Sequence, residues 1–214
     1  MTGSLKMAKL DFFTMKTQFF GYLSLAALVL IFGYTDSSIT LLGINVAWYT
    51  ALMSSNIFAI QEKDNLDRLY GSLSISLKNI IFGRYIFMVL NYILSFLGAI
   101  ILYSVLTLFQ NRPLDLVNTL FAFGTSFVIF SAITGVEMPL FFKMGYTKAK
   151  VWFLLVFVVI LALALSPFFI PALSEAIQPM LANKSICVVI AVLASCVIQY
   201  ISYRASILAY RKRV

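Results

Sequence analysis

The side chains that usually perform chemistry in proteins are scarce in this sequence. No histidine occurs among the 214 residues, which excludes catalytic triads, metal sites and proton relays that depend on an imidazole. Cys187 and Cys196 are nine positions apart. On a helix this spacing separates them by about 13 Å on opposite faces, so they neither pair with each other nor supply a zinc site. No G-x-x-x-x-G-K-[ST] motif is present for binding a nucleotide. We therefore expect no catalytic residue, metal or cofactor in the chain, and we expect it not to be an enzyme.

One ionisable side chain, Glu137, stands inside a long apolar stretch. A charge at the middle of a membrane is costly and tends to be functional, so Glu137 is a candidate for ion coupling or gating. It lies 21 residues beyond Leu116, a depth of about 31 Å on a helix, which is close to the thickness of the bilayer core. We therefore favour an interfacial position with Lys143 as its ion-pair partner, and we keep the gating role as the alternative.

Amide and hydroxyl side chains mark the apolar stretches at a few positions. Asn91 and Ser95 fall on one helical face together with Gly98. Such residues are candidates for lining a translocation path, but small residues also let helices pack closely in a bundle or a dimer. The sequence leaves both interpretations open. The candidates for the path are Asn45, Asn56, Asn91 and Ser95.

The elements that must position these residues are membrane-spanning helices. Hydrophobic residues make up 62% of the chain and charged residues only 11%, whereas soluble domains carry about 25% charged residues. The charged residues divide the sequence into six uncharged runs, each near the roughly 20 residues that a helix needs to cross a bilayer. We predict an all-α integral membrane protein, a single transmembrane domain over residues 1–214. Its six transmembrane helices are predicted at about 17–35, 38–61, 85–110, 116–142, 151–172 and 185–208.

The basic residues predict how the chain is oriented in the membrane. The net charge is +8, but the charges lie between the apolar runs, and short loops rich in Lys and Arg stay in the cytoplasm. This rule places both termini in the cytoplasm and makes nucleic acid an unsuitable partner. Of the 16 basic residues, only Arg112 and Lys184 fall on the outer side. The inner side holds Lys6, Lys9, Lys16, Lys63, Arg68, Lys78, Arg84, Lys143, Lys148, Lys150, Arg204, Arg211, Lys212 and Arg213.

The connector between the second and third spans has an internal order of its own. Leu66, Leu69, Tyr70 and Leu73 recur at helical spacing and form one apolar stripe. Asp64 and Arg68 are four apart with the acid first, and Gly71 follows as a helix stop. A short amphipathic helix over about Glu62 to Tyr70 is therefore predicted. Its stripe packs either against the underside of the bundle or in a groove on another protein.

Two motifs resemble the permease subunits of bacterial type-2 ABC exporters. The first is E-K-D-N-L-D-R-L-Y-G-S-L-S-I-S at 62–76, followed by Gly83-Arg84-Tyr85. The second is M-P-L-F-F-K-M-G-Y-T-K-A-K at 138–150. The two motifs cover about 40 residues, and the six-span topology covers the whole chain. One departure is Ser74, which stands where the family usually has proline.

This resemblance implies that the connector is a coupling helix that docks on a separate ATPase subunit, where ATP and Mg are bound. It also implies a second permease chain, identical or different, a bacterial cytoplasmic membrane with its lipid, and outward export by alternating access. Small six-span members are similar to exporters of amphipathic or antimicrobial peptides. The residues implied to contact the ATPase are Glu62, Asp64, Leu66, Asp67, Arg68, Leu69, Tyr70 and Leu73.

Two other function classes fit the same sequence. In an ion-coupled secondary transporter, Glu137 would be essential and ATP would be unnecessary. In a membrane scaffold or sensor without transport, the apolar stripe would pack on its own bundle and no ATPase would accompany the chain.

Overall fold

The computed structural model describes residues 3–16, 19–35, 38–64, 66, 76–111, 115–169 and 183–211. Within these ranges all regular secondary structure is helical, which confirms the all-α prediction. The helices are α1 (Gly3–Met15), α2 (Phe19–Tyr34), α3 (Ile39–Lys63), α5 (Leu77–Phe109), α6 (Leu116–Met144), α7 (Tyr146–Phe169) and α9 (Lys184–Arg211).

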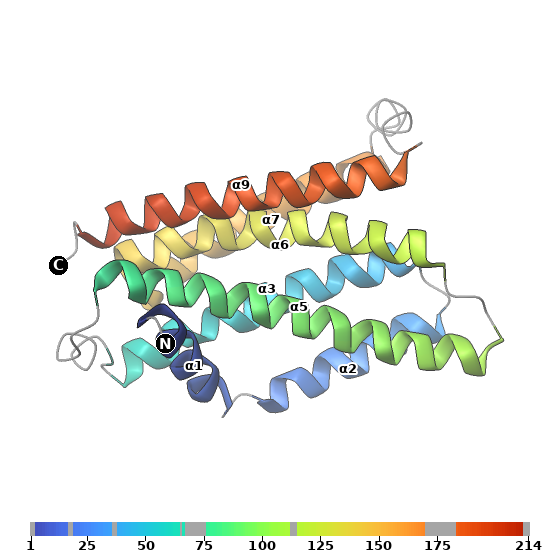
Figure 1. Ribbon diagram of the computed structural model, residues 1–214, viewed down its shortest axis with the longest axis horizontal. Helices are drawn as coiled ribbons and strands as arrows, with labels where there is room; N and C mark the ends of the chain where they lie inside the picture. The colour runs from blue at the N-terminus through green and yellow to red at the C-terminus, as the bar shows by residue number, and fades with distance from the viewer. Residues whose placement is uncertain are drawn as a thin grey trace.

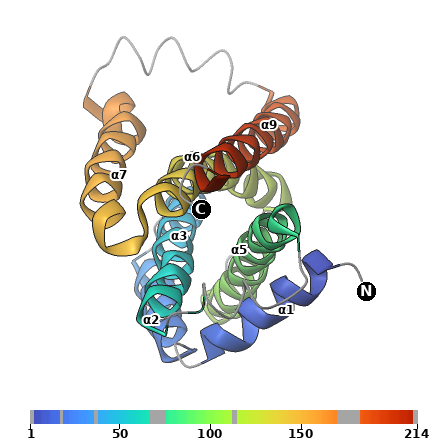
Figure 2. The same ribbon diagram turned by 90° about the vertical axis from the view of Figure 1, so that its left-hand side faces the viewer.

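The long helices form an up-and-down bundle with α1 lying across one end (Figures 1 and 2). Helix α1 is turned by 78° from α2. The start of α1, the end of α3, the start of α5 and the end of α9 all lie at the same end of the bundle (Figure 1). We call it the connector end, because the chain between α3 and α5 joins the bundle there.

The observed helices cover the predicted spans closely at most ends and extend beyond them at two. Helix α5 begins at Leu77, ahead of the predicted span start at 85, and α7 begins at Tyr146, ahead of the predicted start at 151. The charged residues Lys78 and Arg84 were taken as boundaries, whereas the helix simply continues through them. Helix α7 likewise continues to Phe169, past Pro167. By length and composition α5, α6 and α9 each qualify as membrane-crossing helices, and the bent pair of α1 and α2 qualifies jointly. Six crossings and the cytoplasmic placement of the termini stay predictions.

Polar residues fix several helix ends. The Asp115 carboxylate accepts hydrogen bonds from the backbone N–H groups of Val117, at 2.9 Å, and Asn118, at 3.4 Å, and so caps the N-terminus of α6. Gly145 separates α6 from α7 with a φ of 77°, a backbone conformation that glycine adopts at little cost. These caps determine where the chain turns, and hence which residues meet at the connector end.

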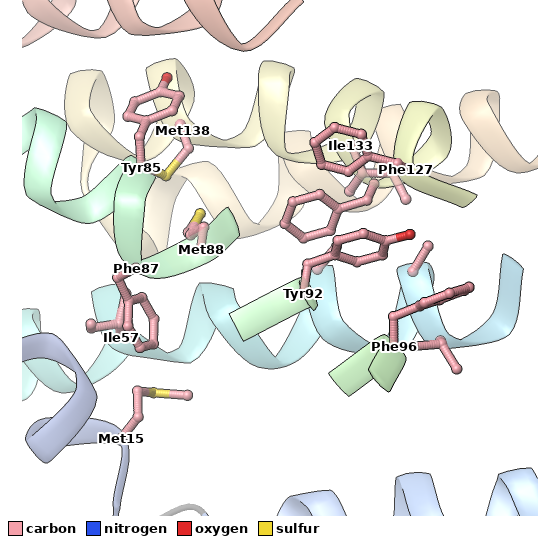
Figure 3. Packing of buried hydrophobic residues seen from close by; sticks show 14 of the residues in the cluster. Met15, Ile57, Tyr85, Phe87, Met88, Tyr92, Phe96, Phe127, Ile133 and Met138 are labelled. Atoms are coloured by element: carbon pink, nitrogen blue, oxygen red, sulfur yellow. The ribbon is translucent and has the colours of Figure 1, made fainter. Parts of the chain in front are cut away.

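The core is an aromatic stack between α5 and α6. The Tyr92 ring stacks on Phe130 with centroids 4.6 Å apart and on Phe127 with centroids 5.3 Å apart. Its hydroxyl shares a 2.7 Å hydrogen bond with Ser126. Figure 3 shows Tyr92, Phe127 and Phe96 together, with Met88, Phe87, Ile57 and Met15 of the same cluster leading toward α1. Stacked aromatic pairs add about 0.5–1.5 kcal/mol beyond their burial, so the stack contributes to holding α5 and α6 together.

Small residues bring α6 against its neighbours. A Cβ added at Gly135 would lie 2.8 Å from Ile198 of α9, and one at Gly124 would lie 3.2 Å from the backbone of Val188. On the other side, Gly43 of α3 approaches the Ala122 carbonyl oxygen, which would be 3.1 Å from an added Cβ. Bundle packing is therefore the role of the small residues on α6.

The outer faces of the bundle are apolar. Val151 on α7 is 74% exposed and Leu193 on α9 is 62% exposed. Leu94 and Ile101 on α5 are exposed too. Exposed apolar surface over several helices is what a lipid environment requires, and it would be unfavourable in water.

The contact between α1 and α5 depends on glycine at position 83. A Cβ there would lie 2.5 Å from the Ser4 carbonyl oxygen and 2.7 Å from the Met7 Cβ. We expect Gly83→Ala to destabilise the chain by about 1–3 kcal/mol through overpacking. Gly98→Ala on the same helix is the matched control, because its added Cβ meets nothing within 4 Å. Thermal unfolding in detergent compares them, and equal unfolding temperatures for the two variants would contradict the close contact.

Candidate functional site

The predicted coupling helix lies between α3 and α5, and the structure describes only its edges. Asp67, Arg68, Leu69, Tyr70 and Leu73 lie outside the described residues. The predicted start at Glu62 was wrong, because α3 continues through Lys63 and Asp64 follows as its C-cap. Gln61, Glu62 and Lys63 are good helix formers, so nothing in the sequence ends the second span before them.

Glu62 connects the two motifs that the sequence singles out. Its carboxylate accepts hydrogen bonds from the Thr147 backbone N–H at 3.1 Å and from the Thr147 hydroxyl at 2.5 Å. Thr147 is in the first turn of α7, where unpaired N–H groups and the helix dipole favour a negative charge. The end of α3 is therefore attached to the start of α7.

Leu66 is the one residue of the predicted apolar stripe within the described ranges. Its partly buried side chain packs against Met7 of α1 and Ile80 of α5, both of which are buried. The first residue of the stripe therefore contacts the chain's own helices.

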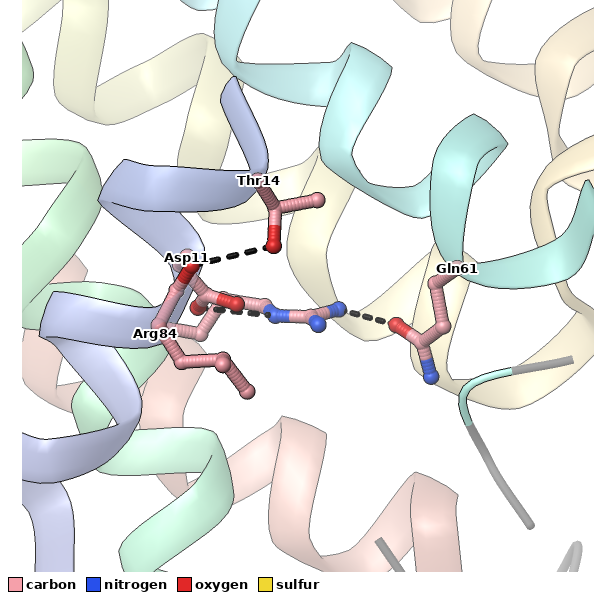
Figure 4. A network of polar contacts seen from close by, with 5 residues as sticks. Asp11, Thr14, Gln61 and Arg84 are labelled. Atoms are coloured by element: carbon pink, nitrogen blue, oxygen red, sulfur yellow. Dashed lines mark hydrogen bonds and ion pairs between the residues drawn. The ribbon is translucent and has the colours of Figure 1, made fainter. Parts of the chain in front are cut away.

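Arg84 is the centre of a buried polar cluster at the connector end (Figure 4). Its guanidinium is fully buried and lies 3.3 Å, Nε to Oδ2, from the equally buried Asp11 of α1. Its Nη1 donates a hydrogen bond to the Gln61 side-chain oxygen of α3. One side chain of α5 thus contacts both α1 and the last turn of α3. The connector begins after that turn of α3 and ends at the start of α5.

Aromatic rings and opposite charge stabilise the cation in this cluster. The guanidinium carbon lies 4.6 Å from the ring centre of Phe58 on α3 and 5.9 Å from that of Phe142 on α6. Such cation–π contacts contribute about 2 kcal/mol when the groups are desolvated. Burial raises the pKa of the Asp11 carboxyl, and the positive charge of Arg84 limits that rise. The cluster therefore joins α1, α3, α5 and α6 in one packed unit.

The neighbours of Arg84 extend the contacts of the same turn. Gly83 lets α1 approach, as described above. The Tyr85 hydroxyl is hydrogen-bonded to Ser202 at 2.5 Å and to Ser206 at 2.8 Å, both on α9. The Gly83-Arg84-Tyr85 motif thus connects α5 to α1 through Gly83 and Arg84, to α3 through Arg84, and to α9 through Tyr85. A displacement of the connector would be passed to α1, α3, α6 and α9 through these contacts.

The predicted Glu137–Lys143 ion pair is not formed in the structure. Glu137 is fully buried, seven residues before the end of α6, whereas Lys143 is exposed. Neither Glu137 carboxylate oxygen has a hydrogen-bond partner among the residues described. The Ser55 hydroxyl of α3, which lies nearby, donates to its own Leu52 carbonyl at 2.7 Å. Glu137 faces the bundle interior because it lies on the side of α6 that packs toward α3. Counting residues along a helix gives the depth of a side chain in the membrane but not the side of the helix on which it lies.

The four candidates for a translocation path do not converge on one site. The Asn45 amide donates to the Leu41 carbonyl at 2.8 Å within its own helix, and the Asn56 amide lies 3.7 Å from the Met53 sulfur. By contrast, Asn91 and Ser95 line a groove of about 810 Å³ between α1, α2 and α5.

Neither Cys187 nor Cys196 forms a disulfide bond. No cluster of three potential metal ligands occurs within the described ranges. What the connector end holds is a set of packing and hydrogen-bonding contacts between helices, an arrangement suited to transmitting movement.

Comparison with known proteins identifies the family. A family model described as "ABC-2 family transporter protein" matches residues 6–211. The chain belongs to the ABC-2 transporter family. No curated protein and no solved structure matches it. Membership of this family agrees with the recognition of a type-2 ABC permease from the motifs at 62–76, 83–85 and 138–150, and it makes the chain a multi-pass membrane subunit of an ABC transporter.

Sequence reasoning missed most of the cluster that this ABC-2 family protein builds around Arg84. Arg84 was counted as a loop cation, Asp11 as part of a polar flank, and Gln61 as the end of a span. One signal was available. Asp11 is the single acid among the 16 residues that precede the first span, and an isolated acid in an apolar surrounding is a candidate partner for a basic residue elsewhere in the chain.

Proposed function

We propose that this ABC-2 family chain is the permease subunit of an ATP-driven exporter, powered by a separate ATP-binding subunit. ATP binding closes the paired nucleotide-binding subunits, and the segment between α3 and α5 moves with them. The bundle then exposes its path alternately to the two sides of the membrane. No covalent step takes place in this chain.

The observation that carries the proposal is the Arg84 cluster. The proposed coupling segment leaves α3 after Lys63 and enters α5 at Leu77. Gln61 in the last turn of α3 and Arg84 in the second turn of α5 are hydrogen-bonded to each other. Arg84 also holds α1 through Asp11. A push on the segment therefore acts on a joined group of helices, because close-packed interiors transmit displacement. The Glu62 contact with Thr147 carries the same push to α7.

We extend the proposal to the assembly and its cargo. Two permease chains, identical or different, form the transporter in a bacterial cytoplasmic membrane. The cargo is an amphipathic or hydrophobic substance, with peptides first, as the resemblance to peptide exporters suggests. The scarcity of charge within the apolar stretches supports a cargo with a large apolar surface.

Export by reconstituted vesicles tests the proposal against an ion-coupled mechanism. We expect export of labelled amphipathic peptides by the complete complex to require hydrolysable ATP. Glu137→Gln keeps the shape of the side chain and removes its charge, and we expect ATP-dependent export to persist in this variant. A non-hydrolysable ATP analogue is the control for nucleotide binding alone. Export that continues without ATP and disappears in Glu137→Gln would overturn the proposal and favour a secondary transporter.

A further inference from the structure

An open groove lies between α1, α2 and α5. Its volume is about 810 Å³, in the range of about 300–1,000 Å³ that small-molecule sites occupy. Along α5 its lining runs from Phe87 to Leu102, a length of about 22 Å. One leaflet of the bilayer core is about 15 Å thick. The groove is therefore long enough for an acyl chain.

Most of the lining is apolar, and the main polar groups within it already have partners. The Tyr22 hydroxyl donates to the Asn91 side-chain oxygen at 2.8 Å. The Asn91 amide in turn donates to Ser54 at 3.0 Å. Because these groups bond to each other, the middle of the groove offers few polar partners and suits a hydrocarbon chain. Gly98 leaves further room, since a Cβ there meets nothing within 4 Å.

The end of the groove next to α1 is positively charged. Lys16 lines it and is exposed, next to the exposed rings of Phe12 and Phe13. Lys16 forms no ion pair with any described residue. None of the described residues that line the groove is Asp or Glu, and Asp11 on α1 is buried against Arg84. A cation at the mouth of an apolar groove complements a molecule with an anionic head and an apolar tail.

We propose that this groove binds an anionic phospholipid of the leaflet at the connector end. The phosphate lies at Lys16, and one acyl chain extends between α2 and α5 past Gly98. The bound lipid fills the space beside Phe87, three residues from Arg84, and so supports the packing of α1 against the bundle. The inference concerns lipid binding and does not depend on the identity of the exported cargo.

Lipid retention measures the site directly. The full chain is reconstituted in nanodiscs that contain equal amounts of phosphatidylglycerol and phosphatidylcholine, together with its ATP-binding partner where the two co-purify. Native mass spectrometry of the protein released from the nanodiscs then measures which lipid stays bound. We expect phosphatidylglycerol to be retained about fivefold over phosphatidylcholine, the preference that one lysine near an anionic head group provides. Lys16→Gln is expected to remove that preference. Gly98→Leu, which fills the groove, is expected to abolish retention of both lipids.

Two matched control variants distinguish lipid binding in the groove from general effects of changing charge or side-chain size. Lys6→Gln removes an exposed lysine of α1 that does not line the groove, and Leu97→Phe enlarges an exposed residue of α5 outside it. Both are expected to retain phosphatidylglycerol like the wild type. Gly98→Ala serves in place of Gly98→Leu if the leucine variant does not fold, with reduced retention expected.

Two results would overturn the inference. Equal retention of both lipids, unchanged by Lys16→Gln, would show adventitious adsorption only. Unchanged lipid retention in Gly98→Leu, with loss of the dimer, would show that a second copy of the chain occupies the groove.

Discussion

Replacing Arg84 by methionine is expected to destabilise the folded chain by about 3–5 kcal/mol, because it leaves the buried Asp11 carboxylate without its counter-charge. Asp11 is fully buried and one of its oxygens already has no hydrogen-bond partner among the described residues. Thermal unfolding in detergent measures the loss, at about 2–4 °C for each kcal/mol in a chain of this size. The same variant should weaken the stimulation of ATP hydrolysis by substrate, since α5 loses its hydrogen bond to Gln61 of α3.

The double variant with Asp11→Asn isolates the ion pair. Asparagine removes the buried charge, so Arg84→Met combined with Asp11→Asn should be more stable than the sum of the single losses predicts, by about 0.5–3 kcal/mol. Arg211→Met, at the exposed end of α9, is the control for removing an arginine. If Arg84→Met and Arg211→Met unfold at the same temperature, Arg84 does not hold these helices together.

Combining Leu69→Asp with Tyr70→Ala is expected to separate the permease from its ATP-binding partner while the chain stays folded in the membrane. If these side chains fill a pocket on the partner, each truncation removes a contact of about 2 kcal/mol or more, so association should weaken about 100-fold or more. Co-purification of the two subunits and substrate-stimulated ATP hydrolysis should both be lost. Unfolding temperature is measured in parallel, because a docking defect leaves it unchanged.

Two further variants make this result specific. Tyr70→Phe keeps the ring and should keep the complex. Leu116→Asp places the same charge at an exposed residue at the start of α6, at the opposite end of the bundle, and it should leave the complex intact. Full coupling in the double variant would argue that the segment packs only on its own bundle, as Leu66 does.

Much of the fold can be predicted from the sequence because apolar runs of bilayer length leave little choice of structure. The second span was predicted at 38–61, where the structure has a helix over Ile39–Lys63, and the sixth was predicted at 185–208, where it has a helix over Lys184–Arg211. The start of α5 at Leu77 lies ahead of the predicted 85 because charged residues were taken as ends of helices. A helix can bury an arginine when other elements provide the opposite charge and the aromatic faces. The groups that contact Arg84, namely Asp11, Phe58 and Phe142, all lie on other helices.

The candidate site was predictable only in part for the same reason. The motifs identify Glu62 and the Gly83-Arg84-Tyr85 turn, but their partners Thr147, Asp11, Ser202 and Ser206 are distant in the sequence. Rotation of a helix about its axis decides such contacts. Glu137 is an example, since the face it occupies packs toward α3 and away from Lys143.

Photo-crosslinking from position 69 tests the central claim most directly. A photoreactive amino acid replaces Leu69 in the full chain, which is expressed in its native cells together with their other proteins. The crosslinked partner is then identified by mass spectrometry. The same amino acid at position 116, on the opposite end of the bundle, is the control. The proposed function predicts a crosslink from position 69 to a nucleotide-binding ATPase, and none from position 116. Crosslinks from position 69 that reach only the chain's own helices would contradict it.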